Sequence, residues 1–124
     1  MLITVILVFA GGAFGAVLRE AFMLGVPKLS DGFPLDIFLA NVLASFLIGV
    51  VAALHARGKL GTHANLLLAT GVMGGLSTFS SFVYGALTEG SRSPAGLGVA
   101  TAYLLLSLAA GYGAVLAGNR VGAR

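Results

Sequence analysis

Four long apolar stretches in a chain of only 124 residues constrain the possible folds more than any other feature. They cover residues 2–18, 35–54, 64–87 and 95–117, and each is close to the roughly 20 residues with which an α-helix crosses a bilayer. Charged residues make up 9% of the chain, whereas a soluble domain carries about 25%. The sequence therefore predicts an all-α membrane protein with four transmembrane helices, which form a single domain over residues 1–124.

The first stretch also resembles a cleaved signal peptide, because it is short and contains small residues such as Ala10 and Gly12. Residues 1–4 lack the basic residues that precede the apolar part of a signal peptide. We therefore expect the first stretch to be retained as a helix. Because the chain contains no cysteine, it cannot use disulfide or thiolate chemistry.

The third stretch combines glycines and hydroxyl side chains at membrane depth. The glycines are Gly71, Gly74 and Gly75, and the hydroxyls follow at Ser77, Thr78, Ser80 and Ser81. Glycine weakens a helix, and lipid offers no partner to a freed carbonyl or a hydroxyl group. A broken helix there must be buried in protein or line a path for ions or solutes. The sequence predicts that the third helix is broken in mid-membrane.

Positive charge is almost balanced between the two sides of the membrane. With four spans, one side carries Arg57, Lys59, Arg120 and Arg124, and the other carries Arg19, Lys28 and Arg92. Orientation follows the Lys and Arg asymmetry of short loops, so two outcomes stay open: one weakly biased orientation, or insertion in both orientations. Insertion both ways would favour an antiparallel homodimer with its two-fold axis in the membrane plane. Freed carbonyls of both broken helices would then meet and suit a hard monovalent cation.

Polar side chains follow single faces of the second and fourth stretches at four-residue spacing. The two sets are Asn41, Ser45 and Gly49, and Tyr103, Ser107 and Gly111. The amide of Asn41 can donate to a passing anion or bond to a neighbouring helix. Tyr103 and Ser107 can likewise line a polar path or serve packing, and the sequence leaves these alternatives open.

Phe79 and Phe82 stand three residues apart, on one face of the segment after the expected break. Such a pair is commonly part of a packed core. An aromatic ring also has a positive edge, so a phenylalanine can hold an anion without a formal charge. Both interpretations stay open at this point.

Three other classes of protein are weighed against an anion pathway. A small dual-topology, proton-coupled exporter would need a carboxylate embedded in the membrane, but the acidic residues, Glu20, Asp31, Asp36 and Glu89, lie at or beyond the ends of the stretches. A non-transporting assembly subunit would leave the interior donors without a purpose. An enzyme is disfavoured because His55 and His63 lie in a polar loop with no catalytic partner.

Three motifs follow one another along the chain: Gly11–Arg19, Asn41–Gly49 and the segment Gly74-Gly75-Leu76-Ser77-Thr78-Phe79-Ser80-Ser81-Phe82. Together they resemble the Fluc/CrcB fluoride ion channels. Their order, the four spans and the chain length fit as well, so the resemblance covers essentially the whole chain. It implies a dual-topology antiparallel homodimer in the bacterial inner membrane, with two fluoride pores and one structural sodium ion. It further implies passive electrodiffusion of fluoride out of the cytoplasm, which relieves fluoride toxicity.

The resemblance also assigns roles to residues. It implies a fluoride pore lined by Asn41, Phe79, Phe82, Ser80, Ser81, Tyr103 and Ser107. The main-chain carbonyls of Gly74 and Ser77, from both subunits, would bind sodium, and Arg19 would lie in a vestibule. The chain departs from the family at Gly111, where relatives often have a hydroxyl, so the end of the polar path near Gly111 is the least defined.

Overall fold

The computed structural model describes residues 1–27 and 33–124, and within these ranges every regular element is helical. The elements are α1 (Leu2–Gly25), α2 (Leu35–Ala56), α3 (Thr62–Asn65), the π-helix η1 (Leu66–Met73), α4 (Gly74–Leu76), α5 (Phe79–Arg92) and α6 (Pro94–Gly122). Elements α3 to α5 together form the third span. Over the described residues, four helical stretches are long and apolar enough to cross a membrane. The predicted four-span, all-α fold is confirmed.

The helices extend beyond the apolar stretches from which they were predicted. Helix α1 continues to Gly25, so Arg19 lies inside a helix and not after its end. Helix α6 begins at Pro94, where Ser93 caps it by accepting a hydrogen bond from the amide of Gly96 at 3.1 Å. The N-cap at Ser93 thus determines where α6 begins, whereas the hydropathy pattern predicts only the central part of each span. Lys28 and Asp31, which entered the charge and acid comparisons, lie outside the described residues.

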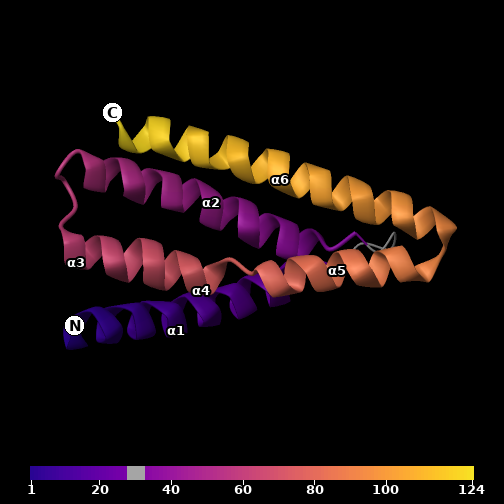
Figure 1. Ribbon diagram of the computed structural model, residues 1–124, viewed down its shortest axis with the longest axis horizontal. Helices are drawn as coiled ribbons and strands as arrows, with labels where there is room; N and C mark the ends of the chain where they lie inside the picture. Colours follow the sequence, from indigo (N-terminus) through magenta and orange to yellow (C-terminus); the bar gives the residue numbers. More distant parts are fainter. Residues whose placement is uncertain (28–32) are drawn as a thin grey trace.

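The helices form two closely packed pairs (Figure 1). Helix α1 runs along η1 and α4, and α2 runs along α6. After the break, α5 continues as the partner of α6. Both chain ends and the α2–α3 turn lie at one end of the molecule, and the α5–α6 turn lies at the other (Figure 1). The Arg57 guanidinium donates to the carbonyl of Ala123, which joins the α2–α3 turn to the C-terminal end of α6.

Glycines bring the backbones of each pair into contact. A Cβ atom at Gly118 of α6 would collide with the Phe46 carbonyl oxygen of α2, and one at Gly49 would collide with the carbonyl of Val115. In the other pair, a Cβ at Gly15 would collide with the carbonyl of Val72. Small residues allow such approach in lipid, where helix association depends on van der Waals packing. These contacts hold the two helices of each pair close together.

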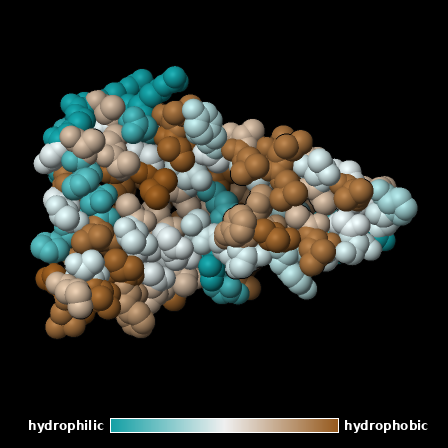
Figure 2. Space-filling model, viewed as in Figure 1, coloured by the Kyte–Doolittle hydropathy of each residue, from teal (hydrophilic) through white to brown (hydrophobic). Residues whose placement is uncertain are grey.

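The molecule tapers along its length (Figure 2). Its broad end contains the four-helix part and its hydrophilic surface, and the narrow end contains α5 and α6. Apolar side chains cover much of the narrow part in this view. The broken third span lies where the broad and narrow parts meet (Figure 1).

Candidate functional site

The third span is interrupted by two extended residues. Helix α4 ends at Leu76 and α5 begins at Phe79. Between them, Ser77 has ψ 153° and Thr78 has φ −146° and ψ 115°. Thr78 is also the N-cap of α5, since its hydroxyl accepts from the amide of Ser81. The break predicted in mid-span is therefore present.

Side chains capture the two amides that would otherwise continue the helix. In an α-helix, each amide donates to the carbonyl four residues earlier, so Thr78 would bond to Gly74 and Ser81 to Ser77. The Thr78 amide instead donates to Asn41 Oδ1 at 2.8 Å. The Ser81 amide donates to Thr78 Oγ1 at 3.2 Å. The carbonyls of Gly74 and Ser77 thereby lose their helical partners.

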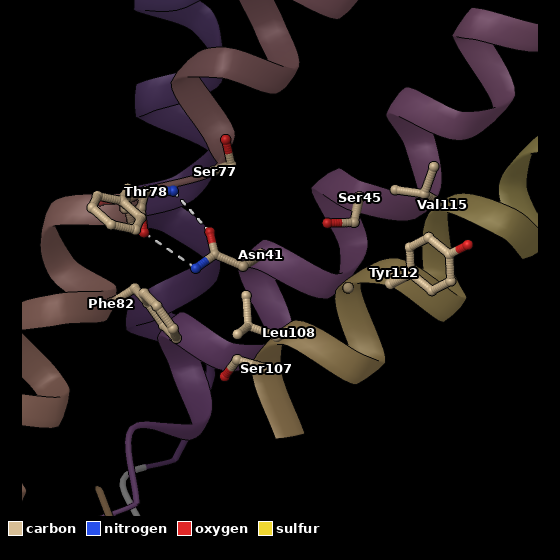
Figure 3. A pocket seen from close by; sticks show the side chains of 11 residues that line it. Asn41, Ser45, Ser77, Thr78, Phe82, Ser107, Leu108, Tyr112 and Val115 are labelled. Carbon is tan, nitrogen blue, oxygen red and sulfur yellow. Dashed lines mark hydrogen bonds between the residues drawn. The ribbon is translucent and has the colours of Figure 1, made fainter. Parts of the chain in front are cut away.

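Asn41 completes the arrangement with a second hydrogen bond. Its Nδ2 donates to the carbonyl of Thr78 at 3.2 Å, so one side chain bonds both backbone groups of one residue (Figure 3). Thr78 is buried, with 7% of its surface exposed. The amide of Asn41 therefore serves as helix-to-helix contact, and its second N–H remains available to another acceptor.

Gly74 and Ser77 line the same small cavity, of about 150 Å³. Ser45 and Met73 also contribute to its wall. Neutral carbonyl oxygens freed from a helix can coordinate a hard monovalent cation, so these two residues fit the predicted sodium site in donor chemistry. Gly74 is exposed on the surface of the single chain.

A larger open cavity, of about 360 Å³, lies between α2, the break and α6 (Figure 3). It brings together four of the predicted pore residues, Asn41, Phe79, Phe82 and Ser107. The remaining lining residues are Ser45, Ser77, Thr78, Leu108, Gly111, Tyr112 and Val115. None of the residues that line this cavity carries a formal charge. The cavity can offer dipoles and ring edges to an ion, but no countercharge.

The orientation of the hydroxyl groups distinguishes the cavity from the outer surface. The exposed hydroxyls of Thr88, Ser91 and Thr101 each donate at 2.8 Å to the carbonyl four residues earlier. In the described part of the chain, the Ser45 hydroxyl makes no hydrogen bond, and the buried Oγ of Ser107 has no partner. Both hydroxyls therefore have unused hydrogen-bonding capacity, although the Oγ of Ser107 is itself buried in the single chain.

The predicted aromatic residues differ in their surroundings. Phe82 is 9% exposed and packs on Tyr103, with ring centroids 5.3 Å apart. Phe79 is 78% exposed and lies 5.9 Å from Phe82 by centroid distance. Phe82 thus belongs both to the core and to the cavity wall, whereas the ring of Phe79 projects from the subunit.

Four other predicted site residues lie outside this lining. Tyr103 is fully buried beneath Phe82, and its hydroxyl has no partner among the described residues. Ser80 and Ser81 join the Thr78 hydroxyl, with oxygen distances of 3.3 Å and 3.1 Å. Arg19 lies half-buried on α1. Their predicted roles in the pore and vestibule remain predictions.

Five residues of the cavity lining were not assigned to the site from the sequence: Ser45, Thr78, Leu108, Tyr112 and Val115. Thr78 carried a usable signal, because a threonine before an apolar helical segment is a common N-cap. Ser45 stood on the polar line of α2 but was not assigned to the pore. Its hydroxyl lies 3.5 Å from the position that a Cβ at Gly111 would take.

Comparison with known families identifies the chain. Residues 6–119 match the family model for CrcB-like protein, Camphor Resistance (CrcB). The chain belongs to the CrcB family. Its relatives include a fluoride-specific ion channel FluC 3 of Yersinia pseudotuberculosis, which is 50% identical over 95% of this chain and 87% of the relative. The fluoride-specific ion channel FluC of Deinococcus radiodurans is 41% identical over 92% and 90% of the two chains.

A further relative, fluoride-specific ion channel FluC 1 of Brucella abortus, is 53% identical over 98% of this chain. The match covers 45% of that relative, so the chain spans about half the length of this CrcB protein. All three relatives are named as ion channels and none as an enzyme, in agreement with the prediction of a non-enzyme. Bacterial relatives and four membrane-spanning helices agree with the predicted multi-pass location in the bacterial inner membrane.

Proposed function

We propose that this CrcB-family chain forms a fluoride-selective channel, through which fluoride leaves the cytoplasm by passive electrodiffusion. The uncharged cavity beside the break carries this proposal. It combines the spare amide hydrogen of Asn41, the free hydroxyls of Ser45 and Ser107, and the ring of Phe82. The fluoride-specific names of the relatives support the same ion.

The chemistry of the cavity suits a small, strongly hydrated anion. Entry into a narrow path requires that donors replace the water shell, and conduction requires that the ion leave again. Neutral N–H and O–H groups satisfy both needs, because they bind fluoride without the deep electrostatic well of a lysine or arginine. Chloride is larger and a poorer hydrogen-bond acceptor, so the same donors favour it less.

The surface around the break supports a second subunit. Gly74, Phe79 and Ser80 are exposed there on the single chain, although lipid cannot satisfy carbonyls and hydroxyls. An antiparallel homodimer would cover this surface with its own copy and close each open cavity into a pore. Such a dimer has two pores, and at its centre the Gly74 and Ser77 carbonyls of both copies would hold one sodium ion.

We expect purified protein in liposomes to release fluoride down its gradient at least about a hundredfold faster than chloride. Neutral donors lower the barrier more for the better acceptor, and a hundredfold ratio corresponds to about 2.7 kcal/mol in barrier height. The measurement is halide-electrode recording of efflux after potassium ionophore is added. Equal fluoride and chloride rates would contradict the proposed selectivity.

One observation keeps a proton-coupled exporter as a second candidate. Glu89 is only 5% exposed and pairs with Arg92 at 3.2 Å, and a buried carboxylate could carry a proton. It lies in the last turn of α5 and does not line the cavity near Asn41. If an imposed pH gradient drives fluoride against its own electrochemical gradient in vesicles that contain the protein, and not in protein-free vesicles, the exporter is favoured over the channel.

Ser45→Ala is expected to lower fluoride flux roughly threefold to tenfold, since one hydrogen bond contributes about 1 kcal/mol. Adding Gly111→Ser to this variant should restore part of the flux, because the new Cβ would stand 3.5 Å from the former hydroxyl position. Thr88→Ala serves as the control, since that hydroxyl bonds to its own helix and does not line the cavity. Unchanged flux in Ser45→Ala would remove Ser45 from the pore.

A further inference from the structure

We propose that Asn41 and Thr78 are positioning residues that create the cation site by holding the third span open. Neither side chain is one of the proposed sodium ligands. Each one captures the amide that a continuous helix would direct at a cation-binding carbonyl. The inference rests on the proposed sodium site and adds the residues on which the free state of its ligands depends.

The correspondence between captured amides and freed carbonyls is complete for the two proposed ligands. Asn41 Oδ1 holds the amide of Thr78, the helical partner of the Gly74 carbonyl. Thr78 Oγ1 holds the amide of Ser81, the helical partner of the Ser77 carbonyl. One hydrogen bond from each side chain therefore accounts for one free carbonyl.

The burial of Thr78 makes water a poor substitute for the hydrogen bonds at this residue. Thr78 is 7% exposed, and a buried backbone amide without a partner is strongly unfavourable. If the Thr78 hydroxyl is removed, the nearest route to satisfy the Ser81 amide is its return to the Ser77 carbonyl. That return would lengthen α5 toward α4 and withdraw a ligand from the cation.

The same arrangement connects the cation site to the pore wall. Asn41 lines the large cavity while it bonds Thr78 (Figure 3). Ser77 borders both the large cavity and the small one that contains Gly74. A change in the break therefore moves the spare amide hydrogen of Asn41, so the loss of the cation site and the loss of flux should occur together.

The experiment measures how sodium changes thermal unfolding of the detergent-purified full chain, in sodium chloride against N-methylglucamine chloride at equal ionic strength. For the wild type we expect sodium to raise the midpoint by roughly 5 °C, as for an ion well above its dissociation constant. Thr78→Val and Asn41→Leu should lose most of this increase, because neither new side chain can accept a hydrogen bond from the amide that the native side chain holds. Thr78→Ser retains the hydroxyl and should retain the increase.

Thr101→Val is the matched control, because the Thr101 hydroxyl is exposed and bonds to the Leu97 carbonyl of its own helix. It should respond to sodium as the wild type does. If sodium raises the unfolding midpoint of Thr78→Val as much as that of the wild type, the positioning role is overturned. The sodium site itself would still be supported by the rise in the wild type. A wild type that does not respond to sodium would overturn both. Fluoride flux of the wild type, measured in parallel, tests the proposed channel function separately from the sodium site.

Discussion

Phe82→Ile is expected to reduce fluoride flux at least about tenfold, which corresponds to about 1.4 kcal/mol in barrier height. Phe82 lines the cavity together with Asn41 and Ser107, and isoleucine has no positive ring edge to present to an anion. Isoleucine remains apolar and branched, so the packing on Tyr103 is reduced but not removed. The measurement is initial efflux from liposomes at matched protein density.

The control for this substitution is Phe14→Ile on α1. Phe14 is 58% exposed and lies outside the cavity, so the same chemical change there should leave flux within about twofold of wild type. Size-exclusion profiles of both variants establish that the assembly persists. If Phe82→Ile conducts fluoride like the wild type, the ring edge has no role in conduction, and Phe82 is a core residue alone.

Gly118→Val is expected to destabilise the protein by about 3 kcal/mol or more, the upper range for overpacking of a tight interface. A Cβ at this position would overlap the carbonyl of Phe46, so α6 must move away from α2. That movement widens the cavity, because Asn41 and Ser45 lie on α2 while Ser107 lies on α6. We expect a lower unfolding midpoint and a large loss of monodisperse protein.

Gly98→Val, also on α6, provides the matched control. A Cβ at Gly98 would meet no atom within 4 Å, so this variant should unfold close to the wild-type temperature. Equal midpoints for Gly118→Val and Gly98→Val would contradict the close approach of α2 and α6.

The predicted break agrees with the structure, because local chemistry decides it. A hydroxyl-rich segment after glycines pointed to the break, and the break lies at Ser77 and Thr78. The four-residue spacing pointed to a polar face on α2, and Asn41 and Ser45 both line the cavity. These predictions needed only the period of a helix and the high free energy of an unpaired polar group in lipid.

Other features depended on contacts between distant segments. Asn41 was weighed as an anion donor or a helix contact, and both its oxygen and one amide hydrogen bond to Thr78, 37 positions along the chain. The eight-residue π-helix before the break also alters which residues share a face, so a period of 3.6 could not place Gly74 and Ser77. Tyr103 and Ser107 lie one turn apart, yet only Ser107 reaches the cavity.

By itself, the sequence determined that this chain spans a membrane four times and that its third span cannot be continuous, because apolar length and unpaired polar groups are properties of short segments. The tertiary structure decided which carbonyls are free and which hydroxyls face the cavity. Each of those outcomes depends on a hydrogen bond or a close backbone contact between helices. Such contacts form only when residues far apart in the chain, such as Asn41 and Thr78 or Phe46 and Gly118, are packed together.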